Sequence, residues 1–267
     1  AMQYLDPVLL REDLLRSLYY LHSQPPLFNL LLGLVLKVSP DPGLSYELLF
    51  KTMGLLIPLL LYDSLTVLGT GYLAAGMASL VFMLNPTLIL YEHLLYYTHV
   101  ETFLVLLAIC CLARWGDGRK TVALVLFWGA LLCLSLVRSL FHPVFFLVLA
   151  LVLAGYLYRF MQEQGQARRI FFTAVVIVLL PLAALCIKNR LVFGFFGTSS
   201  WDGMSLWNKV NGCSAEELEA LHRSGVISSR ALEADLEPFK PITRYPGLEA
   251  AAAARCHHPA DCTIWKS

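Results

Sequence analysis

Long apolar runs separated by short polar turns dominate the chain. The first run, at 27–38, has about a dozen residues and is short for a full membrane span. Longer runs follow at 44–62, 72–90, 99–114, 121–140, 143–159 and 170–191. Their lengths approach the ~20 apolar residues that cross the hydrocarbon core of a bilayer. The pattern predicts an all-α fold, a polytopic bundle of membrane helices.

The residues before the first run predict an amphipathic helix over 7–22. Its apolar positions recur four residues apart, at Leu10, Leu14 and Leu18, with polar residues mostly opposite. Asp6 and Pro7 are the residue types that favour an N-cap and the first helical position. An amphipathic helix placed next to a membrane run is expected to lie in the membrane interface.

The chain becomes polar after residue 193. Ser214 and Glu217 have capping-box spacing, and Gly225 is a typical helix stop. The sequence therefore predicts a small, mostly helical extracytoplasmic tail. Three regions are expected: an interfacial helix and turn, a transmembrane region and this tail, at 1–26, 27–193 and 194–267.

Basic residues predict the orientation in the membrane. They are densest at 114–120 and 158–169, and basic loops remain in the cytoplasm. Counting spans outward then places the turns near 91–98 and 138–143, and the tail, outside. The N-terminal helix shares that side if 27–38 dips in and returns or lies shallow. If 27–38 crosses instead, the N-terminal helix lies on the cytoplasmic side; the first option is favoured.

Composition agrees with a membrane location. The 267 residues are 58% hydrophobic and 15% charged, with a mean hydropathy of +0.65. A soluble domain is roughly half apolar and a quarter charged. The formal net charge is only +1 and no lysine/arginine run occurs, which argues against a nucleic-acid partner. The lipid bilayer is the expected partner.

Three of the seven cysteines lie in the polar tail, at Cys213, Cys256 and Cys262. The last two flank the segment CHHPADC. A disulfide-closed loop, a metal-binding loop and free thiols all remain open for this segment.

Polar residues concentrate in four segments that this topology places on one face of the membrane. They are Asp6 to Gln24, Tyr91 to Glu101, Arg138 to His142, and Ser199 to Trp207. Charge inside a membrane is costly and is usually retained for function. These segments are the candidates for a reaction site.

The segment YEHLLYYTHVE is open to two interpretations. As one helix, it would place Glu92 and Tyr96 on one face and His93, Tyr97 and Glu101 on another. Its carboxylates and His99 could serve as a general base or as ion ligands beside sugar-stacking aromatic rings. Alternatively, the segment is an interfacial belt, where tyrosines mark the headgroup level.

The segment LVRSLFHP places Arg138 and His142 one turn apart. The arginine could bind a phosphate through paired hydrogen bonds, or extend to the membrane surface. Lys51 has the same two interpretations. Trp201 suits either interface anchoring or carbohydrate stacking.

Several of these segments resemble a known family. YLHSQPPLFNLLLG resembles the H-x-P-P-L element that begins the second helix of GT-C membrane glycosyltransferases. That class includes protein O-mannosyltransferases and the lipid A aminoarabinose transferase. LFMLNPTLILYEHLLYYTHVETFLVLLA is similar to their following proline-containing helix and polar turn. LVFGFFGTSSWDGMSLW is similar to the exit segment of bacterial members. The resemblance covers most of residues 1–210, in order.

The resemblance implies transfer of a sugar from a polyprenyl-phosphate donor to an acceptor glycan, lipid or protein. The reaction would take place on the outer face of a bacterial inner membrane. The family's catalytic aspartate follows its first helix, which is absent here, so this aspartate is expected upstream of Ala1. Within the chain, Glu92 and Asp6 are the candidate catalytic carboxylates, although an N-cap role already explains Asp6. The candidate substrate-binding residues are His22, Gln24, Tyr96, His99, Glu101, Arg138, His142 and Trp201.

No cofactor follows from these motifs, although a divalent cation is an alternative to a cationic side chain for stabilising the leaving phosphate. Two other functions remain open. A transporter would have polar or broken helices at the bilayer midplane, often as repeats, and no repeat is evident. A non-catalytic envelope scaffold would tolerate the loss of every polar segment.

Overall fold

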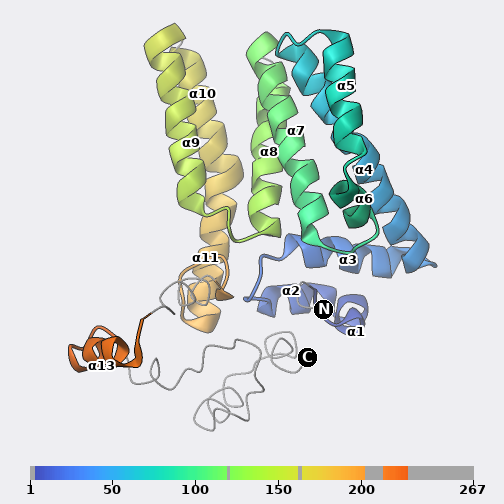
Figure 1. Ribbon diagram of the computed structural model, residues 1–267. Coiled ribbons are helices and arrows are strands. Elements are labelled where there is room, and N and C mark those ends of the chain that lie inside the picture. Colours follow the sequence, from blue (N-terminus) through green and yellow to red (C-terminus); the bar gives the residue numbers. More distant parts are fainter. Residues whose placement is uncertain (1–3, 119–120, 162–163, 202–212, 228–267) are drawn as a thin grey trace.

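The computed structural model describes residues 4–118, 121–161, 164–201 and 213–227. Every regular element in these ranges is a helix (Figure 1). The predicted all-α class is therefore confirmed for the described part of the chain. The predicted soluble tail lies mostly outside it. Within the tail, α13 (Ala215–Arg223) is described, and its Ser214–Glu217 capping box and the positive φ of Gly225 are as expected.

The amphipathic segment near the N-terminus forms two helices instead of one. These are α1 (Pro7–Glu12) and α2 (Leu14–Tyr20), and Asp13 between them has φ −132° and ψ 52°. That conformation is outside the helical region, so the chain bends there. The predicted apolar face is nevertheless correct, because Leu10 and Leu14 are buried.

Helix α3 (Leu27–Val38) runs across one end of the bundle instead of along it (Figure 1). It packs against α1, α4 and α8. The Tyr46 hydroxyl, on α4, donates a 2.7 Å hydrogen bond to the carbonyl of Leu32. A crosswise helix does not by itself define a depth in the membrane, so the expectation that residues 27–38 dip in and return or lie shallow stays a prediction.

The remaining helices run along the bundle. They are α4 (Pro42–Val67), α5 (Tyr72–Met83), α7 (Tyr97–Gly118), α8 (Thr121–Val137), α9 (Pro143–Tyr156), and α10 (Gln164–Ala174) with α11 (Leu180–Phe193). One turn of wider π-helix, Leu157–Met161, follows α9, and another, Val175–Leu179, joins α10 to α11. In the described ranges, three helices are long and apolar enough to cross a membrane: Pro42–Val67, Tyr97–Gly118 and Gly165–Phe193.

The span predicted over 72–90 is broken. Helix α5 ends at Met83, and the short α6 (Pro86–Glu92) leaves at an angle of 59°. Pro86 explains the break, because its ring disfavours a helical conformation at the preceding Asn85 and it has no N–H to donate. The Asn85 side chain accepts a 2.8 Å hydrogen bond from Thr87 and caps α6. The pair counts as a fourth span only if the two helices are taken together.

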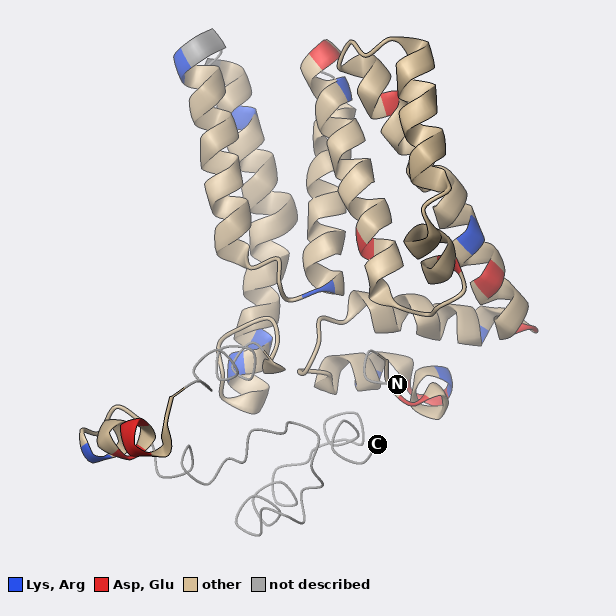
Figure 2. Cartoon of the chain, in the orientation of Figure 1, with Lys and Arg blue, Asp and Glu red and all other residues tan. Residues whose placement is uncertain are grey.

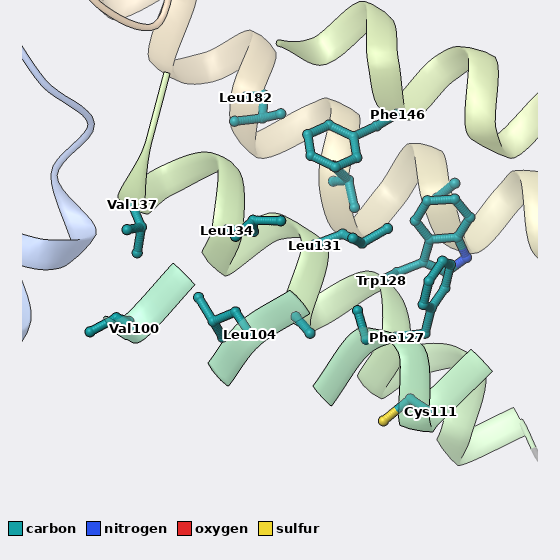
Figure 3. Close-up of a cluster of buried hydrophobic side chains, with 14 of the residues drawn as sticks. Val100, Leu104, Cys111, Phe127, Trp128, Leu131, Leu134, Val137, Phe146 and Leu182 are labelled. Atoms are coloured by element: carbon teal, nitrogen blue, oxygen red, sulfur yellow. The ribbon is translucent and has the colours of Figure 1, made fainter. Parts of the chain in front are cut away.

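Helix α8 lies at the centre of the apolar core (Figure 3). The indole of Trp128 is fully buried, and Phe146 of α9 and Leu182 of α11 lie on the same side of α8. Leu104 and Val100 of α7 lie against its other side. Many large apolar side chains are exposed on the outer helices, including Leu73, Val81, Val152 and Leu180. An outer surface of this kind suits contact with lipid instead of water.

The two ends of the bundle differ in chemistry (Figures 1 and 2). One end carries the α4–α5 turn, the end of α7 and the start of α10, and with them the described residues of the basic segments 114–120 and 158–169. The other carries α1 to α3, the α6–α7 turn, the α8–α9 turn and the end of α11. We call this second end the polar end. The four polar segments therefore gather at one end, as the sequence predicts, as far as the described residues go.

Candidate functional site at the polar end

An ion pair joins α7 to the α8–α9 turn. Arg138 donates from Nη1 to Oε2 of Glu101 over 2.8 Å, and its guanidinium lies 5.4 Å from the ring centre of Tyr97. Tyr97 and Glu101 are four residues apart on α7, so both face the arginine. Phe28 of α3 meets Tyr97 edge to face at 6.1 Å. The pair therefore connects α3, α7 and the turn after α8.

Glu101 is mostly buried in this ion pair, whereas Arg138 uses only part of its hydrogen-bonding capacity there. The Glu101 side chain is 15% exposed, whereas that of Arg138 is 38% exposed. Only one guanidinium nitrogen donates to Glu101. The other N–H groups of the guanidinium donate to no described residue. They are therefore available to bind an anionic ligand.

The turn predicted near 91–98 is confirmed, so YEHLLYYTHVE is not one helix. Helix α6 ends at Glu92, and α7 begins only at Tyr97. The shared face of Glu92 and Tyr96 therefore does not exist, and His93 is separated from Tyr97 and Glu101. Tyr96 packs its ring against Tyr91 at 6.3 Å instead.

Glu92 lies against α4. A Cβ atom placed on Gly54 would be 2.2 Å from Oε1 of Glu92 and 2.6 Å from its Cδ. The carboxyl group thus fills the space that any other residue at position 54 would need. Glu92 is partly buried, and its side chain makes no hydrogen bond or ion pair with a residue in the described ranges.

His99 is a buried contact between α7 and α4. Its Nε2 lies 3.0 Å from the carbonyl oxygen of Phe50, and its ring stacks on the Phe50 ring at 5.6 Å. Donation to that carbonyl places a proton on Nε2. The side chain is 1% exposed, and its Nδ1 has no hydrogen-bond partner among the described residues. Solvent therefore does not reach His99 in this conformation.

The opening motif HSQPP binds the segment that leaves α11. His22 Nδ1 lies 2.9 Å from Oγ of Ser200, whose backbone N–H donates to the His22 carbonyl over 2.9 Å. The Ser199 hydroxyl donates to the carbonyl of Ser23. These contacts join residues 22–23 to residues 199–200, about 180 positions away in the sequence. His22 therefore has a structural role here, and we call this set of contacts the His22 joint. Gln24 is partly buried beside this joint and also has a partner.

The sequence did not single out Lys188 as part of this joint. Its ammonium group donates to the carbonyls of Tyr19 and Leu21 over 3.0 and 3.2 Å, at the end of α2. A cation there complements the negative end of the helix dipole. A lone lysine inside an apolar run was the available signal, because such a charge needs a partner.

Other predicted residues have structural roles. Asp6 accepts a 2.8 Å hydrogen bond from the Val8 N–H and caps α1. His142 caps α9, with its Nδ1 3.4 Å from the Val144 N–H. The expectation that His142 shares a helix face with Arg138 is wrong, because α8 ends at Val137.

Trp201 is partly buried where the described part of the exit segment ends. Its backbone N–H donates to the Ser199 hydroxyl over 3.1 Å, which ties it to the His22 joint. Lys51 is paired with Glu47 on the surface of α4, with 2.5 Å between Nζ and Oε1.

No group of three or more metal-ligating side chains occurs in the ranges that the structure describes. The segment CHHPADC, with Cys256 and Cys262, lies outside those ranges.

A second ion pair lies near the opposite end and was also not predicted. Arg114 of α7 donates from Nε and Nη2 to the two carboxylate oxygens of Asp63 on α4. The Cys110 thiol donates to the same carboxylate over 3.0 Å. Arg114 and Asp63 are 51 positions apart in the sequence, so the sequence pattern gives no sign that they pair.

Comparison with known proteins adds no relative: no family model, no curated protein and no solved structure matches this chain. The structure itself defines a class: over the residues it describes, the protein is all-helical and has three helices long and apolar enough to span a membrane.

Proposed function

We propose that the chain is a membrane glycosyltransferase that uses a polyprenyl-phosphate sugar donor at the polar end. The observation that carries the proposal is the state of two charged side chains at that end. Glu92 has no ion-pair partner among the described residues, and Arg138 is a partly exposed cation with unused N–H groups. A base and a phosphate-binding cation are the two groups that such a transfer needs.

The local geometry distinguishes the three acidic candidates. Asp6 caps a helix, and Glu101 is bound to Arg138. Glu92 keeps its oxygen lone pairs available to accept a proton. It is therefore the best candidate within this chain for the catalytic base.

The proposed reaction is a direct displacement. Glu92 takes the proton of the acceptor hydroxyl, and the hydroxyl oxygen attacks the anomeric carbon of the sugar. The bond between that carbon and the phosphate oxygen breaks, and its electron pair remains on the phosphate. Arg138 stabilises the added charge; a divalent cation, if bound, would supply the same stabilisation. The polyprenyl chain lies in the bilayer against the apolar outer surface of the helices.

The two groups lie on different sides of the first turns of α7. Glu92 contacts α4, whereas Arg138 lies between α7 and the α8–α9 turn. A donor that reaches both must lie across the start of α7, near Tyr96 and Tyr97. Aromatic rings at that place suit contact with a sugar face.

The charge distribution supports an orientation. The described residues of the basic segments 114–120 and 158–169 lie at the end opposite the proposed site, and basic segments are retained in the cytoplasm. We therefore place the polar end, with α13, outside the cytoplasm. We propose a lipid-linked sugar as the donor on that side. Such a donor needs no nucleotide-binding domain, because its lipid tail lies between helices in the bilayer.

One observation favours a second function, transport. The break between α5 and α6 resembles the discontinuous helices that line transporter sites. However, α6 lies at the polar end and not in the middle of the bundle. The transferase is therefore the better-supported proposal.

The test measures sugar transfer by the full-length protein in proteoliposomes, with labelled polyprenyl-phosphate sugars. We expect Glu92→Gln to lower the rate by about 10²–10⁴-fold, the contribution typical of a general base. Arg138→Gln should weaken donor use, with a higher KM. Glu47→Gln is the matched control, because this glutamate is exposed and paired on the surface of α4. Equal rates for Glu92→Gln and Glu47→Gln would remove Glu92 from the site.

A further inference from the structure

The last turns of α4 and α7 form an open groove at the end of the bundle opposite the polar end. Its volume is about 540 Å³, within the roughly 300–1,000 Å³ of ligand-binding clefts. Most of its lining is apolar: Val67 and Leu68 at the end of α4, and Ile109, Leu112 and Ala113 of α7. Gly116 and Asp117 continue the lining toward the end of α7. We call this feature the α4–α7 groove.

Charged side chains of both signs lie at this end of α4 and α7 (Figure 2). Arg114 donates from Nε and Nη2 to the carboxylate of Asp63, one turn before Val67. Its Nη1 makes no hydrogen bond with any residue in the described ranges, and its side chain is 59% exposed. Asp117 is exposed and has no partner in the part of the chain that the structure describes. The groove therefore combines a free carboxylate with an arginine that has unused N–H groups.

The position of the groove favours a lipid as its occupant. Helices α4 and α7 are both long and apolar enough to cross a membrane, and the groove occupies their last turns. Such turns lie where the hydrocarbon core of a bilayer meets the headgroups. Exposed Leu68 and Ile109 suit contact with an acyl chain, whereas Asp117 and Arg114 suit contact with a headgroup. The lipids of the bilayer are also the molecules present at high concentration at this depth.

The described charges favour one class of phospholipid. The carboxylates of Asp63 and Asp117 outweigh the single guanidinium of Arg114 by one unit. An anionic headgroup without a cation would meet this net negative charge, whereas a headgroup with a phosphate and an ammonium group finds a partner for each. Arg114 and Asp117 are three positions apart on α7, so their Cβ atoms lie about 5–6 Å apart. The two-carbon linker of phosphoethanolamine can bridge that spacing.

We propose that the α4–α7 groove binds a phosphatidylethanolamine molecule of the bilayer. Its acyl chain lies against the apolar lining, its phosphate accepts from Nη1 of Arg114, and its ammonium donates to Asp117. In the orientation given above, this lipid belongs to the cytoplasmic leaflet. The site is independent of the proposed sugar transfer, because it lies at the opposite end and shares no residue with it.

A photoreactive lipid tests the site. The probe is phosphatidylethanolamine with a diazirine in the middle of one acyl chain, added at a low fraction to phosphatidylcholine nanodiscs that hold the full chain. After irradiation and digestion, mass spectrometry should find the modification on peptides that contain residues 67–68 and 109–117. Unlabelled phosphatidylethanolamine should halve this labelling at a mole fraction about fivefold lower than phosphatidylglycerol with the same acyl chains. Fivefold is the effect of one ordinary hydrogen bond.

Two variants separate the parts of the site. Asp117→Asn should remove the fivefold preference between the two competing lipids, with Glu216→Gln on exposed α13 as its control. Gly116→Leu should lower the labelling of 109–117 at least about fivefold, because its side chain enters the groove. Gly155→Leu on α9 is the matched control, since a Cβ on Gly116 or Gly155 meets nothing within 4 Å. Thermal unfolding of each variant shows that the fold is retained, and both controls should label like the unaltered chain.

Three results would overturn the proposal. They are even labelling over all the exposed helices, equal labelling of Gly116→Leu and Gly155→Leu, and competition by phosphatidylglycerol at the same or a lower mole fraction. The last would favour an anionic lipid bound by Arg119 and Lys120, which follow in the sequence. An unchanged preference in Asp117→Asn would remove Asp117 from the site. Sugar transfer is measured in none of these experiments, so the proposed function stands or falls separately.

Discussion

The ion pair between Arg138 and Glu101 should contribute measurably to stability. Its Nη1–Oε2 distance is 2.8 Å, and the glutamate side chain is only 15% exposed. Removal of the arginine would leave a mostly buried carboxylate without its cation. Exposed pairs contribute about 0.2–1 kcal/mol, and breaking a fully buried pair costs about 3–5 kcal/mol. Because Arg138 is 38% exposed, we expect a coupling free energy of about 1–2 kcal/mol.

A double-mutant cycle measures this coupling. Glu101→Gln, Arg138→Gln and the double variant are compared by denaturant unfolding in one detergent. The matched control is the cycle for Glu47 and Lys51, whose side chains are 50% and 47% exposed. An exposed pair four residues apart on a helix should give only about 0.3–0.5 kcal/mol. A coupling free energy for Arg138–Glu101 no larger than that for Lys51–Glu47 would contradict the expected effect of burial.

Three further results are expected. Gly194→Ala should lower the free energy of unfolding by about 1 kcal/mol, because Gly194 ends α11 with a φ of 83°, and thermal unfolding of purified protein would show this. His99→Phe keeps a ring on Phe50 but leaves the Phe50 carbonyl without its side-chain donor; a loss of about 1 kcal/mol by the same measurement is expected, and no loss would show that stacking alone matters. Cysteines at the exposed positions 19 and 117, in a chain without native cysteines, should react with an impermeant maleimide from opposite sides of the membrane; reaction of both from one side would contradict the orientation.

Local signals in the sequence predicted much of the fold. Asp6 and the Ser214–Glu217 box cap helices as expected, and Pro143 begins α9. Capping depends on a few neighbouring residues, so a sequence pattern is sufficient to recognise it. The gathering of the polar segments at one end also followed from the sequence, because apolar runs of similar length bring alternate turns to the same end.

The breaks were predicted less well. Residues 7–22 have a helical pattern of side chains, but the chain leaves the helix at Asp13. The segment contains no internal proline or glycine, the residues that usually announce a break. Tertiary packing of the short helices α1 and α2 decides this position, and hydrophobic periodicity does not report it. The turn near 91–98, in contrast, was predicted.

The pairing of charges could not be predicted from the chain alone. Glu101 pairs with Arg138, 37 positions away in the sequence, and Asp63 pairs with Arg114, 51 positions away. Both pairs depend on how α7 packs against its neighbours. Gly54 had no signal of its own either, since its role depends on the approach of Glu92 from α6.

The central claim is that Glu92 at the polar end is the base of a lipid-linked sugar transfer. The most direct measurement is single-turnover transfer from a labelled polyprenyl-phosphate sugar by Glu92→Gln, with Glu47→Gln beside it in the same proteoliposomes. The claim predicts a rate at least about 10²-fold lower for Glu92→Gln and an unchanged rate for Glu47→Gln. Transfer at the unaltered rate by Glu92→Gln would contradict it.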